Sequence, residues 1–405
     1  MKKWKLLLFD PYSPVNPNIP NIGMAFAATV LDARVIDEHI LTYPRNRFLK
    51  EEAETLGISV RSFSSLSAER ARDAYRERYP LASIVSVTGM IDVQCCYPYL
   101  SWKNNLTVDV PFSDEMPFPE YERFDSFNYL SSNWQTGFWS YPLMSSHGCP
   151  YQCLFCASRA RTWRPRSADH CVEELRRAKK NYGIRSFEVI DDAFNIDRER
   201  VLEFCEKVAP LGLSWACTNG IRADRFDEEQ AEAMSKAGCV HVGFGMETTD
   251  SVILSSMKKG ERFKDIERAV DSAVRHFSRV SGFFIIGLPG STKEKDMASL
   301  RWAYGKGIRA HFSYFVPEVK GSTSPVFYGH ASRPLSSAYS AKDQENVYRA
   351  ALRQRRALYK KEGTVAAVLR YTLQGLRRWN HRSRVTHFTQ LVKKGYGLLV
   401  RNDIS

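Results

Sequence analysis

The chain of 405 residues contains no apolar run of the length that a membrane-spanning helix needs, about 20 residues. Its mean hydropathy is −0.37 and a quarter of its residues are charged, as in an ordinary globular protein. The amino-terminal segment MKKWKLLLFDP has a basic tip, but its apolar run extends only from Leu6 to Phe9. Such a run is too short for a signal peptide and is typical of a buried first strand, so we expect a cytoplasmic protein.

The chain also lacks the cysteine pattern of a disulfide-stabilised protein. Nine cysteines, an odd number, occur without a signal sequence, which argues against a disulfide framework. Three of them lie within eight residues. The other six are scattered and are expected to be small buried side chains: Cys95, Cys96, Cys171, Cys205, Cys217 and Cys239. The adjacent pair Cys95-Cys96 would point to opposite faces of a strand and cannot easily chelate one metal.

Residues 1–103 show a small β/α pattern. Strand-like runs at 4–9, 33–36 and 83–88 flank a helix-like run at 22–31. Because the second half of a doubly wound domain is not evident, we expect a truncated Rossmann-like domain. Residues 104–143 are rich in proline, asparagine, serine and aromatic residues without a sustained period, which predicts a linker.

Residues 144–330 alternate short apolar runs with amphipathic segments. Strands are expected at 187–190, 214–217, 240–246, 282–286 and 311–315, and helices near 168–182, 198–208, 228–237, 264–277 and 293–305. This alternation favours a parallel sheet with right-handed crossovers, and about six units suit an α/β fold of the partial TIM-like (β/α)6 barrel type. Active-site groups of such barrels gather where the strands end. Polar and glycine residues follow these predicted strand ends: Asp191, Asp192, Thr218, Asn219, Glu247 and Gly287.

The cysteine cluster is the most specific motif of the chain. Cys149, Cys153 and Cys156 have the spacing C-x3-C-x2-C. Three thiolates on one short loop can bind three irons of a cubane and leave the fourth open to a methionine moiety. A structural zinc site usually has four ligands; His147 could complete a Cys3His set, but no second C-x2-C follows.

The run CPYQCLFC, just after a predicted strand and opening a predicted barrel, resembles the signature of the radical S-adenosylmethionine (radical SAM) superfamily. Further segments recur in the same order in members that follow a cobalamin-binding-type domain: VIDDAFNID, WACTNGIRADRFDEE, AGCVHVGFGMETTD, KKG and GFFIIGLPG. The resemblance is best over residues 144–290 and loose elsewhere.

The resemblance implies roles for individual residues. The three cysteines would bind a [4Fe–4S] cluster, and Phe155 would lie near the adenine of SAM. Other SAM contacts would come from Asp191, Asp192, Thr218, Asn219, Arg222, Glu247 and the turn that contains Gly287.

Structural alternatives exist for several of these residues. Asp191-Asp192 could cap the following helix, Arg222 could pair with a surface carboxylate such as Asp224, and Gly287 could serve only a tight turn. For Glu247, which ends an apolar strand, a functional role is favoured because an unpaired buried carboxylate is costly.

The implied chemistry is reductive cleavage of SAM to methionine and a 5′-deoxyadenosyl radical, with the electron supplied by a donor such as flavodoxin or ferredoxin. Hydrogen abstraction from a small-molecule or lipid-like biosynthetic substrate is the first functional hypothesis. A cobalamin-dependent radical SAM methyltransferase is the second, and a non-catalytic zinc-binding scaffold is the third. The sequence indicates no general base and no radical-quenching residue.

The amino-terminal segment NPNIPNIGMAFAATVLDARVID resembles the opening of a cobalamin-binding domain. A D-x-H-x-x-G motif is not intact, because Asp37-Glu38-His39 is followed by Thr42. A half-sized sheet would also leave the nucleotide tail without a full crevice. We therefore expect a remnant domain, although some enzymes of this type bind cobalamin without a histidine ligand.

The positive charge of the chain belongs to its carboxyl-terminal segment. Residues 331–405 carry sixteen Lys/Arg and four Asp/Glu, a net of +12 of the total +13. Basic helices are expected at 344–362 and 364–379, the second bearing Arg377 and Arg378. These helices could cap the barrel with a solvated face, or contact an anionic membrane surface or a phosphorylated substrate. No RNA-binding module accompanies the charge, so nucleic acid is not an expected partner.

Overall fold

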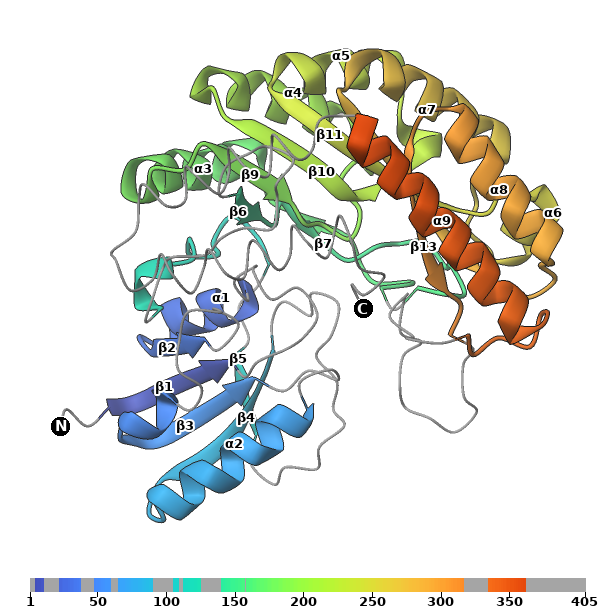
Figure 1. Cartoon of the computed structure of the whole chain (residues 1–405). Helices are drawn as coiled ribbons and strands as arrows, with labels where there is room; N and C mark the ends of the chain where they lie inside the picture. Colours follow the sequence, from blue (N-terminus) through green and yellow to red (C-terminus); the bar gives the residue numbers. More distant parts are fainter. Residues whose placement is uncertain are drawn as a thin grey trace. The chain divides into compact units, whose positions relative to one another are not determined.

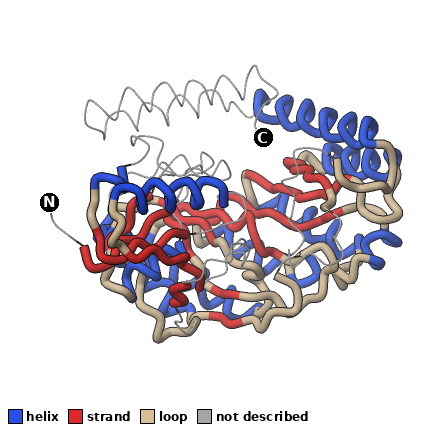
Figure 2. Tube along the Cα trace, turned by 90° about the horizontal axis from the view of Figure 1, so that it is seen from below, coloured by secondary structure: helices blue, strands red, loops and turns tan. Residues whose placement is uncertain are grey.

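The computed structural model describes residues 4–10, 22–37, 47–59, 65–89, 105–108, 112–124, 140–156, 158–316 and 334–361. The described residues fall into two compact units, one ending at residue 124 and the other starting at residue 140 (Figure 1). Figure 2 distinguishes the helices and strands of both units. No described helix is long and apolar enough to cross a membrane.

The amino-terminal unit contains a five-stranded parallel sheet in the order β2-β1-β3-β4-β5. Its strands are β1 (Trp4–Asp10), β2 (Arg34–Asp37), β3 (Ala53–Ser59), β4 (Ser83–Gly89) and β5 (Asn105–Val108). Its α-helices among the described residues are α1 (Ile22–Val30) and α2 (Ser65–Arg78). Phe9, Phe48 and Tyr75 stack in the core, and the Tyr75 hydroxyl accepts a hydrogen bond from the Ala53 N–H at 2.9 Å.

The expected half-sized sheet is wrong in its strand count, because β3, α2 and β5 were not predicted. Strand β3 contains Gly57, where a Cβ would lie 2.6 Å from Val87 and 2.9 Å from Leu8. Close packing therefore requires glycine at this position, and glycine weakens the apolar pattern by which a strand is recognised in the sequence. Half of the residues of helix α2 are charged, and the helix buries only a narrow stripe that includes Ala68, Ala71 and Tyr75. Strand β5 lies in the segment predicted to be a linker.

The carboxyl-terminal unit contains a six-stranded parallel sheet in the order β13-β12-β11-β10-β9-β6. Its strands are β6 (Ser140–Leu143), β9 (Ser186–Val189), β10 (Ser214–Ile221), β11 (Cys239–Glu247), β12 (Arg279–Ile286) and β13 (Arg309–Tyr314). A short antiparallel pair, β7 (Ser146–His147) and β8 (Arg164–Pro165), follows β6. This architecture confirms the expected partial TIM-like barrel of six strands.

The helices of this unit are α3 (Ala168–Tyr182), α4 (Arg198–Val208), α5 (Glu228–Lys236), α6 (Ser251–Ser256), α7 (Phe263–His276), α8 (Lys293–Gly305) and α9 (Ala341–Lys361). Helices α3, α4 and α8 have the predicted bounds. The sequence did not predict α6. Strand β6 was assigned to the predicted linker, because its four residues include a proline. The predicted helix 364–379 and the pair Cys95-Cys96 lie outside the described residues.

Helices cover one face of the six-stranded sheet (Figure 1). On that face Trp215 of β10 stacks on Phe187 of β9 at 5.4 Å between ring centroids and meets Phe204 of α4 edge-on. Because side chains alternate along a strand, the neighbours of Trp215 point to the opposite face, which we call the inner face. Ala216 lies beside His241 of β11 on that inner face.

Candidate active site

The three clustered cysteines lie on the loop between β7 and β8, and all are free thiols. Burial raises the pKa of Cys153 to about 11 and that of Cys156 to about 12, while Lys259 and Arg222 favour the thiolate of Cys153. Three soft sulfur donors beside two cations fit an iron–sulfur cluster held by thiolates.

The backbone of the cysteine loop is fixed on both sides. The N–H groups of Ala160 and Arg161 donate to the carbonyls of Tyr151 and Cys149 at 2.7 and 2.9 Å. Gly148, just before the first cysteine, has φ +85°, and a Cβ there would lie 2.2 Å from the Thr162 carbonyl oxygen. Only glycine fits this position, and this steric limit explains why glycine precedes the first cysteine of the loop.

The loop also packs onto the end of the barrel. Cys153 and Phe155 are buried against Ile253 of α6 and Ile285 of β12. The Leu154 N–H donates to the carbonyl of Met257 at 3.0 Å. Phe155 is 4% exposed and belongs to this apolar cluster, and its contact with the adenine stays a prediction.

Asp192 holds the two ends of the cysteine loop together. One carboxylate oxygen accepts the Gly148 N–H at 3.0 Å, and the other accepts the Ser158 hydroxyl at 2.7 Å. The two donors lie at the ends of the loop, Gly148 immediately before Cys149 and Ser158 two residues after Cys156. Asp192 therefore positions the loop, a role that the predicted SAM contact did not include.

Asp191 is fully buried and bonded to the segment that enters the loop. Its carboxylate accepts the Ser145 N–H, the Ser145 hydroxyl and the Ser146 hydroxyl at 2.6 to 2.7 Å. Burial raises its pKa, although Arg200 and these donors favour the charged form. The alternative that Asp191-Asp192 caps a helix is wrong, because Asp197 is the residue that caps α4. The prediction of a SAM contact stays a prediction.

Arg222 connects the cysteine loop to the strand ends. Its guanidinium lies 3.3 Å from the ring centroid of Tyr151, the residue between Cys149 and Cys153. It donates to Asp224 at 2.9 Å and to the carbonyl of Lys259 at 3.2 Å. The expected pairing with Asp224 is present, but the arginine is buried rather than on the surface.

Glu247 belongs to a buried ion network that the sequence did not reveal. Lys259 donates to Glu247 at 3.0 Å and lies 3.2 Å from Glu261, and both partners are buried. Burial works against the charge of Lys259, but the two carboxylates outweigh it and raise its pKa. Burial raises the pKa of Glu261, although Lys259 and Arg222 act in the opposite direction. The KKG segment was the only sequence signal for Lys259.

The remaining predicted contacts lie on neighbouring strand ends. The Thr218 hydroxyl donates to Glu188 at 2.6 Å, and the Asn219 amide donates to the carbonyl of Asp191 at 3.1 Å. Gly287 has φ +76° and donates its N–H to Asp296 at 2.9 Å, so it does form a tight turn. The predicted residues thus lie around the carboxyl ends of β9, β10, β11 and β12.

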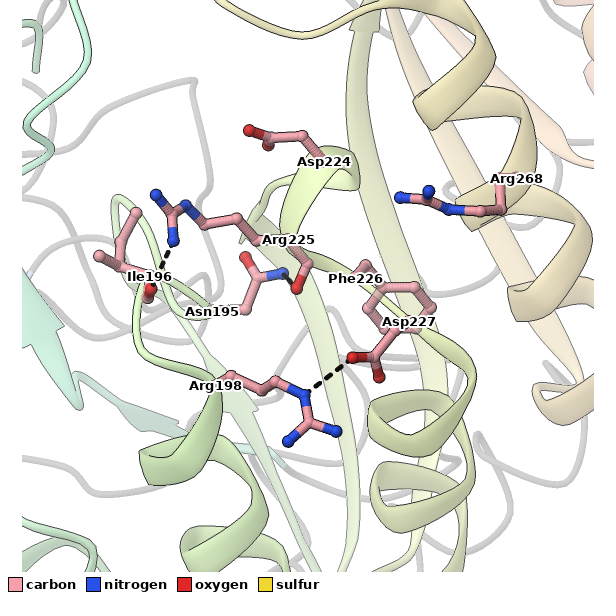
Figure 3. Close-up of a pocket in the computed structure, with 8 residues that line it drawn as sticks. All are labelled: Asn195, Ile196, Arg198, Asp224, Arg225, Phe226, Asp227 and Arg268. Carbon is pink, nitrogen blue, oxygen red and sulfur yellow. Dashed lines mark hydrogen bonds and ion pairs between the residues drawn. The ribbon is translucent and has the colours of Figure 1, made fainter.

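A pocket of about 500 Å³ lies beside these strand ends, in the loops after β9 and β10 (Figure 3). Arg225 from its lining donates to the Tyr151 hydroxyl at 2.6 Å, and Arg198 pairs with Asp227 at 2.8 Å. None of the predicted cluster or SAM residues lines it. The pocket therefore borders the predicted site, because its lining residues Arg225 and Asp224 bond to Tyr151 and Arg222, but it does not include that site.

Among the described residues, no three histidine, cysteine, aspartate or glutamate side chains converge as they would around one metal ion. Thiolates on one tetrahedral zinc lie about 3.8 Å apart, given Zn–S bonds of about 2.3 Å. Thiolates of a cubane each bind a separate iron and therefore need not converge on one ion. His147 lies on β7 beside Arg164 of β8.

Comparisons with known proteins agree with this arrangement. Residues 143–303 match the family model of the radical SAM superfamily. An uncharacterized methyltransferase of Pyrococcus horikoshii is 32% identical over 193 residues, 47% of this chain and 41% of that protein. The cytidylyl-2-hydroxyethylphosphonate methyltransferase of Streptomyces wedmorensis is 27% identical over 60% of this chain and 47% of that protein. The matches thus span less than half of these relatives.

Two solved structures share the fold at low sequence identity. The radical S-adenosylmethionine methyltransferase TsrM from Kitasatospora setae, with tryptophan and a SAM analogue bound, has a TM-score of 0.62 at 15% identity, covering 87% of this chain and 88% of that one. The cobalamin-dependent radical enzyme OxsB, with aqua-cobalamin and SAM bound, has a TM-score of 0.61 at 13% identity, covering 96% and 75%.

Proposed function

Since the chain belongs to the radical SAM superfamily, we propose that it is a cobalamin-dependent methyltransferase of that superfamily. The amino-terminal sheet carries this proposal. Its order β2-β1-β3-β4-β5 is that of a doubly wound domain, whose ligand crevice lies outside the strand ends where the order reverses, here between β1 and β3. The sequence analysis expected a remnant domain whose half-sized sheet would lack a full crevice. A five-stranded sheet with this switch point supports cobalamin binding more strongly.

Methyl transfer is supported over hydrogen abstraction by the relatives. Curated proteins that match this chain include methyltransferases acting on a cytidylyl phosphonate, on bacteriochlorophyllide d and on tryptophan. Because these substrates differ, they do not fix the substrate of this chain. A one-electron donor such as flavodoxin or ferredoxin remains part of the proposal.

The residues of the cysteine loop would hold the cluster, and the strand ends would hold SAM. When bound, the cluster would supply the electron that cleaves SAM to methionine and a 5′-deoxyadenosyl radical, and a bound cobalamin would accept a methyl group from SAM and leave S-adenosylhomocysteine. Asp192 keeps the two ends of the loop together, and Arg222 fixes Tyr151 between the first two cysteines. The buried ion network of Lys259, Glu247 and Glu261 keeps the strand end below the loop rigid and polar.

The test is anaerobic reconstitution of the full chain with iron, sulfide and hydroxocobalamin, followed by addition of SAM and a reductant. We expect about four irons and about one cobalamin per chain, with S-adenosylhomocysteine in the products by mass spectrometry. The triple variant Cys149→Ala, Cys153→Ala, Cys156→Ala should lose iron and all SAM cleavage. The control Cys171→Ala, Cys205→Ala removes two buried cysteines outside the loop and should keep both.

Each other outcome favours another hypothesis. Deoxyadenosine without cobalamin binding would favour hydrogen abstraction. About one zinc per chain, with no iron or sulfide, would favour the scaffold.

A further inference from the structure

The turn after β12 has its backbone bound by side chains from two other segments of the chain. The Gly287 N–H donates to Asp296 of α8 at 2.9 Å, and the Gly287 carbonyl accepts the hydroxyl of Ser336 at 2.5 Å. Ser336 lies 49 residues further along the chain, shortly before α9. Both hydrogen-bonding groups of this one residue at the strand end are therefore fixed by side chains.

Asp296 is a buried carboxylate that also bonds to this distant segment. It is 2% exposed, and besides the Gly287 N–H it accepts the hydroxyls of Ser291 at 2.6 Å and of Tyr339 at 2.5 Å. Burial raises its pKa, and these three donors act in the opposite direction. Because a buried carboxylate is costly unless donors satisfy it, Tyr339 helps to hold the group that binds Gly287.

Gln344 of α9 closes the distant segment around the glycine. Its side-chain amide donates to the carbonyls of Ser336 and Tyr339, each at 2.9 Å, and we call residues 336–344 the clamp segment. A Cβ at Gly287 would lie 2.8 Å from Oε1 of Gln344 and 3.0 Å from Cβ of Ser336. The absence of a side chain at Gly287 therefore lets the clamp segment approach the turn.

The same turn packs against the cysteine loop. Leu288, the residue after Gly287, is fully buried in the apolar cluster that contains Cys153 and Phe155 of the loop and Ile285 of β12. Contacts thus run from the clamp segment through Gly287 and Leu288 to the loop. The clamp segment belongs to the part of the chain after residue 330, for which the sequence suggested only basic helices.

We propose that Ser336 and Tyr339 are positioning residues for SAM, because they hold Gly287 and Asp296 and so keep the β12 turn in the place where it contacts SAM beside the cysteine loop. The inference rests on the proposed function, in which the strand ends hold SAM. Both residues act through the turn and not by touching SAM. A turn that is already fixed in its binding conformation loses less entropy when the ligand binds, so the clamp segment raises the affinity for SAM.

The test measures SAM binding without turnover, by equilibrium dialysis of radiolabelled SAM against the anaerobically reconstituted full chain in the absence of a reductant. Tyr339→Phe removes the hydroxyl that bonds to Asp296. Ser336→Ala removes the hydroxyl that bonds to Gly287, and Ser336→Thr retains one. Iron per chain is measured for each protein before dialysis, and hydrogen exchange reports the protection of the turn.

Two matched controls remove hydroxyls that do not bond to the turn. Ser340→Ala alters the clamp segment itself, because this hydroxyl bonds to Asp343 at the start of α9. Tyr348→Phe alters α9 at a ring that packs beside Tyr314. Both controls would change the stability of α9 without loosening Gly287.

We expect the dissociation constant of SAM to rise roughly fivefold in Tyr339→Phe and in Ser336→Ala, because each loses one buried hydrogen bond. Ser336→Thr should restore part of the affinity, and both controls should bind SAM as the wild type does. Iron content should be unchanged throughout, and the amides of residues 287–291 should exchange faster only in the two weakened variants.

Unchanged SAM affinity in Tyr339→Phe and Ser336→Ala, or equal weakening by Ser340→Ala, would overturn the inference and leave the proposed function standing. Loss of iron from the two variants would overturn it as well, because the clamp segment would then act on the cysteine loop and not on SAM. A wild-type chain that carries the cluster and binds no SAM would overturn the proposed function together with this inference.

Discussion

At the scale of single residues, the site depends on side chains that hold the loop rather than on the cysteines alone. Asp192 and Arg222 each contact the cysteine loop at a different point, one at its ends and one at Tyr151. Asp192 itself follows strand β9, and Arg222 also bonds to Asp224 and to the carbonyl of Lys259, so both residues link the strand ends to the cysteine loop. Both residues were predicted as SAM contacts, and their bonds assign them a positioning role as well.

Asp192→Ala should weaken iron binding without unfolding the protein. The Gly148 N–H and the Ser158 hydroxyl lose their acceptor, so the loop opens, and loss of such supporting groups costs roughly 10-fold or more in metal affinity. The measurement is iron per chain across a titration with a competing chelator. Asp169→Ala, which removes an exposed partner of Lys207, is the control. Equal iron affinity in the two variants would contradict the positioning role.

Arg222→Met should destabilise the carboxyl-terminal unit by about 3 kcal/mol, because removing one member of a buried ion network leaves the others uncompensated. The carboxylates of Asp224 and Glu261 lie 2.9 and 3.7 Å from this guanidinium. Urea unfolding of cluster-free protein measures the change. Arg176→Met, at an exposed ion pair with Glu173, should change stability by less than about 1 kcal/mol. A loss this small for Arg222→Met would refute the network.

At the scale of elements, the connections after the strands decide the chemistry. The cysteine loop after β7 is constrained by glycine, by backbone bonds and by packing on α6 and β12. The register of β11 against β12 shifts between Gly245 and Glu247. A Cβ at Gly245 would lie 2.8 Å from Glu247 and 3.0 Å from Lys259, so glycine leaves the room that this ion pair occupies. Small residues at these points allow charged groups to approach the backbone.

Gly148→Ala should prevent the loop from forming, whereas Gly183→Ala should be mild. Both glycines have positive φ, but a Cβ at Gly148 meets a carbonyl at 2.2 Å and one at Gly183, after α3, meets nothing within 4 Å. We expect Gly183→Ala to cost roughly 1 kcal/mol from its left-handed backbone alone. Reconstituted iron content and thermal unfolding distinguish them. Full iron content in Gly148→Ala would show that the loop tolerates another conformation.

At the scale of the whole molecule, the described residues form two larger parallel sheets. The five-stranded sheet reverses its strand order between β1 and β3, and the six-stranded sheet carries the cysteine loop at its strand ends and His241 and His311 on its inner face. These two histidines affect overall stability, because His241 is buried and His311 is half-buried, and their surroundings lower the pKa of both.

Stability should therefore fall as the pH drops below about 6.5, where the histidines of the unfolded chain take up protons. In the folded chain their pKa values are lowered, so the unfolded state binds more protons in this pH range. Each ring therefore lowers the free energy of unfolding by up to about 1.4 kcal/mol for each unit by which the pH falls. For His311 this continues to a pH of about 3. Urea unfolding between pH 7.5 and 5.5, in buffers without multivalent anions, measures the slope. An unchanged slope in His241→Gln, His311→Gln would refute this origin.

The sequence by itself determined the features that are local or periodic. The C-x3-C-x2-C spacing lies within eight residues, and the strand–helix alternation of the barrel repeats a pattern that burial on both faces of a parallel sheet imposes. The bounds of α3, α4 and α8 follow from their amphipathic faces and their N-caps Ser167, Asp197 and Thr292.

Only the tertiary structure decided the features that depend on register between distant segments. Asp192 meets Gly148 and Ser158, and Lys259 meets Glu247, because β9 and β11 end beside other loops. The layer of His241, Ser281 and His311 exists because three strands align in one register, and a shift by one residue would turn each side chain to the other face. Such long-range pairing leaves no local pattern, which is why β3 and β5 escaped prediction as well.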